Sequence, residues 1–132
     1  MRILIAEDDF TSRKLMQKYL EPLGMCDLAV NGAEAVDAFE SAHFSGAPYD
    51  LICLDIMMPV MDGQQVLKRV RHFEKLQGVL PAKEVKILMT SALDSPRHVV
   101  EAFYRGGCTD YLVKPIDKET VLNKLREVTL FS

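Results

Sequence analysis

Short apolar runs alternate with longer amphipathic segments along the whole chain. The runs at residues 2–6, 51–54 and 85–89 are rich in Ile, Leu and Val, which is typical of strands covered on both faces of a sheet. Two further runs, at 26–30 and 111–113, are more polar or shorter and suit the edges of a sheet. The pattern therefore predicts five strands.

Between and after these strands, apolar residues recur at the spacing of an amphipathic helix. The five segments that show this spacing are Leu15–Leu23, Ala35–Ala42, Val66–Phe73, Val99–Phe103 and Val121–Val128.

Residues that favour helix starts precede four of these segments. They are Asn31, Asp62, Ser95 and Asp117. The first two stand three residues before a Glu or Gln, as in a capping box, and Ser95 is followed by a proline. Asp9 has two interpretations, either the cap of the first helix or a member of a functional site.

Five strand–helix repeats predict an α/β fold, a doubly wound five-stranded parallel sheet with helices on both faces. Apolar central strands with polar second and fifth strands favour the flavodoxin-like order 2-1-3-4-5. No repeat, low-complexity tract or Gly/Ser linker interrupts the chain. We therefore expect residues 1–132 to form a single domain.

Composition narrows the function classes. The chain has 132 residues, and its net charge of −3 argues against a general binder of nucleic acid or anionic membranes. No apolar stretch approaches the ~20 residues of a membrane span, and acids begin at Glu7, too early for a signal peptide. The three cysteines are far apart and odd in number, which fits neither a disulfide framework nor a metal knuckle. The expected compartment is the cytoplasm.

In such a sheet, function collects at the carboxyl ends of the strands, beside the switch point between the first and third. Acids follow the first and third predicted strands, a hydroxyl follows the fourth, and an amine follows the fifth. These residues are Glu7, Asp8, Asp9, Asp55, Thr90 and Lys114.

Clustered carboxylates repel one another unless a cation compensates them. Oxygen ligands favour a hard dication, Mg²⁺ first and Mn²⁺ as an alternative. An Asp, a hydroxyl and a Lys around such an ion also form a phosphoryl-transfer apparatus. Asp8 and Asp55 are the strongest candidates, because a carboxylate directly after an apolar strand is costly without a partner. Asp62 is interpreted only as a cap.

Other polar residues have simpler explanations. His43, His72 and His98 lie in different helices and align with no nucleophile, so we interpret them as surface or filler residues. The third helix also carries a basic stretch, for which a solvated face is the simpler interpretation and partner docking the alternative. The stretch comprises Lys68, Arg69, Arg71, His72 and Lys75.

Four motifs, in order and at matching strand ends, resemble the receiver domains of bacterial two-component response regulators. The resemblance is strongest to single-domain, chemotaxis-type members and covers essentially the whole chain. It rests on ILIAEDD at 3–9, LICLDIMMPVMDG at 51–63, ILMTSA at 87–92 and GCTDYLVKP at 107–115.

The resemblance implies a signalling receiver rather than an enzyme. Asp55 matches the residue that takes a phosphoryl group from a phosphohistidine on a sensor histidine kinase or a histidine phosphotransfer protein. Asp8, together with Asp55, matches a direct Mg²⁺ ligand, and Glu7 matches the acid that reaches the ion through water. Met57 would contribute its backbone carbonyl.

The resemblance also implies a switch. Thr90 matches the hydroxyl that closes onto the phosphoryl group, Lys114 the ammonium that pairs with it, and Tyr111 the aromatic switch. The peptide between Lys114 and Pro115 is expected to be cis. An effector protein would dock on the face formed by the fourth helix, fifth strand and fifth helix. The chain would be a monomer or a phosphorylation-dependent dimer.

Some positions depart from the family pattern. Met57 and Ala92 are apolar and cannot orient a water molecule, so we predict a long-lived phosphoryl group. Cys108 replaces a usual Ala and has no functional account. The stretch 71–84 is longer than usual and adds possible docking surface. Only 116–132 follow the last motif, so a complete chain would act through a partner protein.

Three other classes share parts of this pattern. A haloacid-dehalogenase-type phosphatase needs a second acid where Met57 stands. A flavodoxin-like carrier would have its FMN phosphate repelled by Glu7, Asp8 and Asp9. A phosphorylation-independent interaction module, or pseudo-receiver, should lack one of the key residues. None is missing, and this module remains the alternative.

Overall fold

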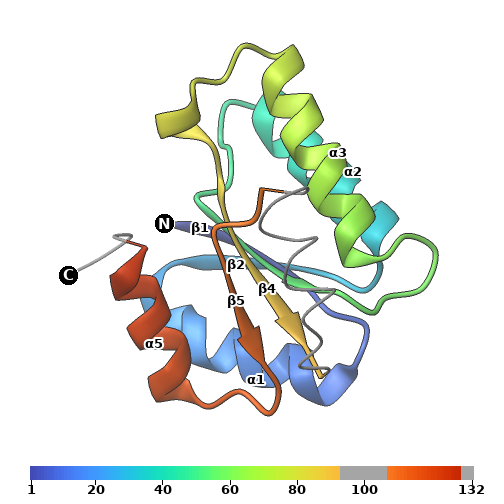
Figure 1. Cartoon of the computed structure of the whole chain (residues 1–132). Coiled ribbons are helices and arrows are strands. Elements are labelled where there is room, and N and C mark those ends of the chain that lie inside the picture. The colour runs from blue at the N-terminus through green and yellow to red at the C-terminus, as the bar shows by residue number, and fades with distance from the viewer. Residues whose placement is uncertain (93–106, 129–132) are drawn as a thin grey trace.

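A five-stranded parallel sheet forms the centre of the computed structural model, which describes residues 1–92 and 107–128 (Figure 1). Its order is β2-β1-β3-β4-β5, which confirms the predicted topology. The strands are β1 Arg2–Ala6, β2 Met25–Ala29, β3 Leu51–Asp55, β4 Lys86–Ser91 and β5 Asp110–Val113.

Helices cover both faces of the sheet. Buried side chains of α1 and α5 pack on one face and those of α2 and α3 on the other. The helices are α1 Phe10–Leu20, α2 Gly32–Phe44, α3 Gly63–Leu76 and α5 Lys118–Glu127, with short 3-10 turns at Glu21–Leu23 and Pro81–Lys83. The expected helix at 99–103, with Ser95 and His98, lies outside the described residues.

Side chains along the central strands contribute alternately to two hydrophobic cores, one on each face of the sheet. Side chains of successive strand residues point to opposite faces. Ile3 and Ile5 of β1 therefore join the core beneath α1 and α5, whereas Leu4 and Ala6 join the core beneath α2 and α3. All four are almost completely buried, as expected of a strand with helices on both sides.

Helix starts follow the local signals in the sequence. Asn31, Asp62 and Asp117 each accept a hydrogen bond from the backbone N–H three residues later, and Asp62 forms a full capping box with Gln65. Asp9 accepts a bond from the N–H of Ser12 at 2.8 Å. The cap interpretation of Asp9 is therefore confirmed.

The first helix is shorter than its apolar spacing predicts. The α-helix ends at Leu20, and Glu21–Leu23 continue as a 3-10 turn up to Gly24. Pro22 explains the change, because proline has no N–H for the α-helical hydrogen bond and its ring clashes with the preceding turn.

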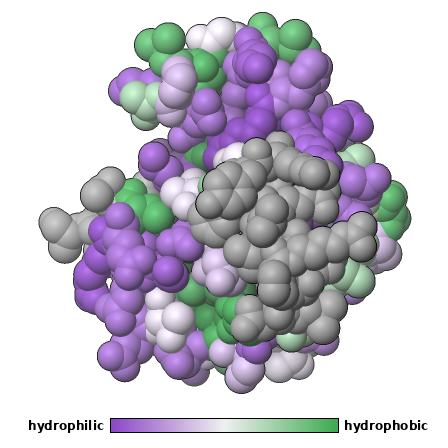
Figure 2. All heavy atoms as spheres, in the orientation of Figure 1, coloured by the Kyte–Doolittle hydropathy of each residue, from purple (hydrophilic) through white to green (hydrophobic). Residues whose placement is uncertain are grey.

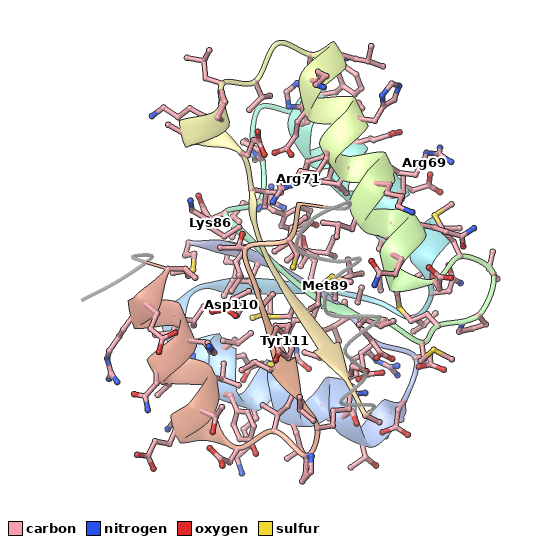
Figure 3. The ribbon with its side chains drawn as sticks, viewed as in Figure 1. Arg69, Arg71, Lys86, Met89, Asp110 and Tyr111 are labelled. Carbon is pink, nitrogen blue, oxygen red and sulfur yellow. The ribbon has the colours of Figure 1, made fainter. Side chains whose placement is uncertain are left out.

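The basic stretch of α3 is not uniformly solvated, so that interpretation is wrong for Arg71. Its side chain is only 17% exposed and lies 2.7 Å from the carboxylate of Glu74, which is itself 3% exposed. Arg71 also donates to the carbonyls of Val85 and Gly107, while Glu74 accepts from the N–H of Val85. We call this pair the Arg71–Glu74 clamp. Figure 3 shows Arg71 directed toward the strands and Arg69 away from them.

None of the helices in the described part of the chain has the length and apolar character that a membrane span requires.

Candidate functional site

Three carboxylates meet at the carboxyl edge of the sheet. Glu7 and Asp8 follow β1, Asp55 ends β3, and one oxygen of each lies within 4.8 Å of the others. Glu7 and Asp55 are 5% and 4% exposed, whereas Asp8 is open to solvent. The neighbouring positions of β1 and β3 in the sheet produce this cluster, as the sequence predicted.

Backbone packing holds Asp55 in place. The N–H of Ile56 donates to the carbonyl of Thr90 at 2.9 Å, and Asp55 and Thr90 are partners in the β3–β4 register. Gly63, the first residue of α3, lies so close that an added Cβ would meet the carbonyl oxygen of Asp55 at 2.3 Å. A glycine is therefore required for α3 to begin directly against the end of β3.

Arg13 orders the acidic loop, a role that the sequence analysis missed. Its guanidinium donates to the carbonyl of Glu7 at 2.9 Å and to that of Asp8 at 3.3 Å. The signal that could have revealed it is an arginine in the first turns of the helix that follows an acidic triplet.

Lys114 brings the fifth strand into the site. Its N–H donates to the carbonyl of Ser91 at 2.7 Å, and the following peptide to Pro115 is cis, as predicted. Its ammonium forms a short ion pair with the carboxylate of Glu7 and lies 3.6 Å from Asp55 Oδ1. One cation thus serves two buried acids.

The surroundings shift the pKa values of Asp55 and Lys114. Burial raises the pKa of Asp55 to about 7, and the hydrogen bond and negative charge of Glu7 act in the same direction. The charge of Lys114 and the N–H of Met57 oppose this shift but do not cancel it. Burial alone would lower the pKa of Lys114, but its bond to Glu7 and the charge of Asp55 raise it overall.

The donor set fits a hard dication. All three side chains offer oxygen, and such carboxylate clusters with adjacent solvent suit Mg²⁺. A dication at this place would also favour the ionised form of Asp55, whose pKa burial and the neighbouring Glu7 hold high. The cluster therefore supports metal binding by Glu7, Asp8 and Asp55.

The remaining predicted site residues divide into two groups. Thr90 is buried and, with Lys114, lines a cavity of about 130 Å³ between α1 and the sheet. The side chain of Met57 is exposed, and Tyr111 packs, partly buried, against the core beneath α2 and α3. Tyr111 therefore lies on the opposite face of the sheet from Thr90, next to Met89 in register (Figure 3).

Comparison with known proteins agrees with this fold and site. Residues 3–126 match the response regulator receiver domain family. The chain is 30% identical over 129 residues to the chemotaxis protein CheY of Treponema pallidum, covering 96% of this chain and 81% of that protein. The chain belongs to the response regulator receiver domain family. It is a CheY-like module of two-component signalling rather than an enzyme.

Two solved structures show the fold in complexes. A chain in the CheX–CheY–BeF₃–Mg²⁺ complex from Borrelia burgdorferi superposes with a TM-score of 0.84 at 26% identity, covering 99% of this chain and 90% of that one. A chain in the co-crystal of the Saccharomyces cerevisiae phosphotransfer protein Ypd1 with the receiver domain of Ssk1 gives 0.82 at 29% identity, covering 96% and 87%.

Many relatives are longer than this chain. It spans 5%, 55% and 7% of the length of three other curated relatives that it matches. In those proteins, the receiver domain is one part of a larger molecule.

Proposed function

We propose that this chain is the phosphoryl-accepting receiver of a two-component phosphorelay. The observation that carries this proposal is the placement of Asp55, buried beside Thr90, 3.6 Å from the ammonium of Lys114 and clustered with Glu7 and Asp8. These are the groups that in-line phosphoryl transfer requires, namely a nucleophile and donors that stabilise negative charge.

The transfer would proceed by displacement at phosphorus. A carboxylate oxygen of Asp55 attacks the phosphorus of a phosphohistidine, the new O–P bond forms, and the P–N bond to the imidazole breaks. Lys114 and the hydroxyl of Thr90 then hold the phosphoryl oxygens. When bound, Mg²⁺, or Mn²⁺ in its place, supplies positive charge next to these oxygens. Asp8, Asp55 and the backbone carbonyl of Met57 would hold it directly, and Glu7 through water.

The surface around the pocket suits a phosphodonor protein. Phe10, Met57 and Val60 are exposed apolar residues that follow β1 and β3 at this edge of the sheet. Exposed apolar groups beside a reactive site mark protein contacts. We infer that a histidine kinase or histidine phosphotransfer protein docks here, as the Ypd1 complex illustrates for a related receiver.

The phosphorylated state would act on an effector protein. Closure of Thr90 onto the phosphoryl group is coupled in this proposal to Tyr111, which lies one residue from Leu112, the partner of Thr90 in the β4–β5 register. The docking face comprises β5, α5 and the segment 93–106, which lies outside the described residues. Residues 1–132 would act as one receiver unit, as a monomer or a phosphorylation-dependent dimer.

The experiment is phosphorylation by acetyl phosphate with Mg²⁺, followed by intact-protein mass spectrometry. We expect the wild type and Asp37→Asn, an exposed control on α2, to gain the mass of one phosphoryl group. Asp55→Asn and a sample with chelator should gain none. Uptake that persists in Asp55→Asn would refute the assignment. No uptake in the wild type would favour the phosphorylation-independent interaction module instead.

A further inference from the structure

The two helices on one face of the sheet, α2 and α3, present opposite charges to solvent. α2 contains no Lys or Arg, and the single acid of α3, Glu74, is buried in the clamp with Arg71. We name the two sets of outward residues the acidic row of α2 and the basic row of α3. The acidic row is Glu34, Asp37 and Glu40, and the basic row is Arg69, His72 and Lys75.

The two rows lie on adjacent helices and overlap along the helix axis. Phe73 of α3 contacts Phe39, His43 and Phe44 of α2, with ring centroids 5.2 to 5.7 Å apart. Both helices follow parallel strands and run in the same direction (Figure 1). These contacts place Phe73 level with residues 39–44 of α2. With a rise of about 1.5 Å per residue, Asp37 and Glu40 therefore lie about level with Arg69 and His72, and the two rows overlap with an offset of about one turn.

The two rows do not neutralise each other within one molecule. The ion pairs between described residues lie elsewhere, and none of them joins α2 to α3. Arg69 extends away from the strands in Figure 3, and hydrophilic residues cover the outer side of α3 in Figure 2. On α2, Glu34 and Asp37 are exposed and Glu40 is half-buried, so both rows reach solvent.

An exposed apolar residue lies at the C-terminal end of each of the two helices. Phe44, the last residue of α2, and Leu76, the last residue of α3, are each 69% exposed. Phe44 is held by an edge-to-face contact with Phe73 at 5.6 Å. A shallow groove next to it is lined by Asp37, Glu40 and Ser41. The groove therefore offers two carboxylates and an apolar ring, and the facing side of α3 offers cations and Leu76.

We propose that the α2–α3 face is a self-association surface that binds a second copy of this chain. A two-fold axis parallel to the helices sets α2 of each copy against α3 of its partner. Each acidic row then meets a basic row, and Phe44 of each copy meets Leu76 of the other, twice per dimer. A two-fold axis across the helices would oppose like rows, and repulsion disfavours that arrangement. The charge pattern thus selects one geometry.

The dimer is expected to be weak. The two helices are about 20 Å long, and because each is about 10 Å across, together they form a face about 20 Å wide. The area of this face is about 400 Å². A standard interface buries ~800 Å² per partner. Association should therefore appear in the micromolar range or above and weaken with salt, because exposed charges are screened. It requires no phosphoryl group, so its outcome is independent of the proposed function.

A charge-reversal experiment tests the pairing. One variant carries Arg69→Glu with Lys75→Glu, and the other carries Asp37→Lys with Glu40→Lys. Sedimentation velocity over a concentration series at low salt should show a wild-type dimer. Each variant alone should dimerise at least ~10-fold more weakly, because attractive pairs become repulsive. A mixture of the two variants should recover dimers, since every acidic row again faces a basic row.

The control variant replaces two cations by acids, as Arg69→Glu with Lys75→Glu does, but on other surfaces of the molecule. Lys18→Glu with Lys118→Glu on α1 and α5 should leave the dimer unchanged. Circular dichroism of every variant confirms that it is folded. A wild type that stays monomeric at all concentrations overturns the proposal. So do reversal variants that still dimerise like the wild type, or a mixture of the two that recovers no dimer.

Discussion

The Arg71–Glu74 clamp and the acidic pocket both bury carboxylates, but they differ in how the charge is matched. Both oxygens of Glu74 accept short hydrogen bonds, one from Arg71 and one from the N–H of Val85. In the pocket, Glu7 and Asp55 share the ammonium of Lys114, and the carboxylate of Asp8 adds a third negative charge beside them.

The difference separates a structural site from a functional one. The fold itself satisfies the clamp, which ties α3 to the start of β4 and to Gly107 just before β5. The pocket holds three carboxylates beside one ammonium, and burial, together with the neighbouring Glu7, raises the pKa of Asp55. Such an imbalance lowers stability unless a ligand with positive charge corrects it.

The largest effect should come from opening the clamp. Glu74→Ala removes the carboxylate 2.7 Å from Arg71, whose guanidinium then has, among the described acids, only the more exposed Glu84 at 3.5 Å, and it leaves the N–H of Val85 without its acceptor. Breaking a buried pair in this way typically costs about 3–5 kcal/mol, and urea unfolding measures it. The matched control is Glu127→Ala, which removes an exposed pair with Lys124 and should cost less than ~1 kcal/mol. Equal losses in the two variants would show that the clamp is not a stability element.

Mg²⁺ should stabilise the pocket and not the clamp. At about 100 times its dissociation constant, a ligand that binds only the folded state raises the unfolding free energy by about 2.7 kcal/mol. We expect this gain in the wild type and no gain in Asp8→Asn or Asp55→Asn. Denaturant unfolding with and without Mg²⁺ is the measurement. A full gain in Asp55→Asn would place the ion elsewhere.

The pH dependence of stability should reveal the cost of ionising the buried Asp55 carboxyl. Folded Asp55 keeps its proton up to about pH 7, whereas an unfolded chain releases it near pH ~4. The folded state therefore binds more protons between these values, and the metal-free wild type loses stability as the pH rises through this window. Asp55→Asn removes this loss. The difference between the folded and unfolded pKa sets an upper limit of about 4 kcal/mol, and solvent screening reduces the expected loss to about 2 kcal/mol. Parallel stability curves for the two proteins from pH 4 to pH 8 would contradict the assignment.

The smallest effect concerns the lifetime of the phosphoryl group. The exposed thioether of Met57 cannot hold a water molecule for attack, whereas an amide can. Met57→Asn should therefore shorten the lifetime by about three- to tenfold, measured as phosphate release after removal of the donor. Leu80→Asn, an exposed change far from the pocket, serves as the control. Decay of the wild type within seconds would contradict the predicted long lifetime.

The sequence by itself determined the features that depend on residues close together along the chain. Alternating runs marked the strands, and Asn31, Asp62 and Asp117 marked helix starts, because a cap acts on the N–H three residues away. The edge of the sheet where the acids gather also followed, since parallel strands place their carboxyl ends together. These are local or topological properties that residue types alone encode.

Only the tertiary structure decided which charges meet. Glu7 and Lys114 pair across 107 positions of the chain, and Arg71 turns inward although Arg69 and His72 of the same helix face solvent. Periodicity could not separate Arg71 from Arg69, because its partners are the carbonyls of Val85 and Gly107, which packing alone brings near. Long-range charge pairing depends on distances that folding creates, and no pattern within a single segment contains them.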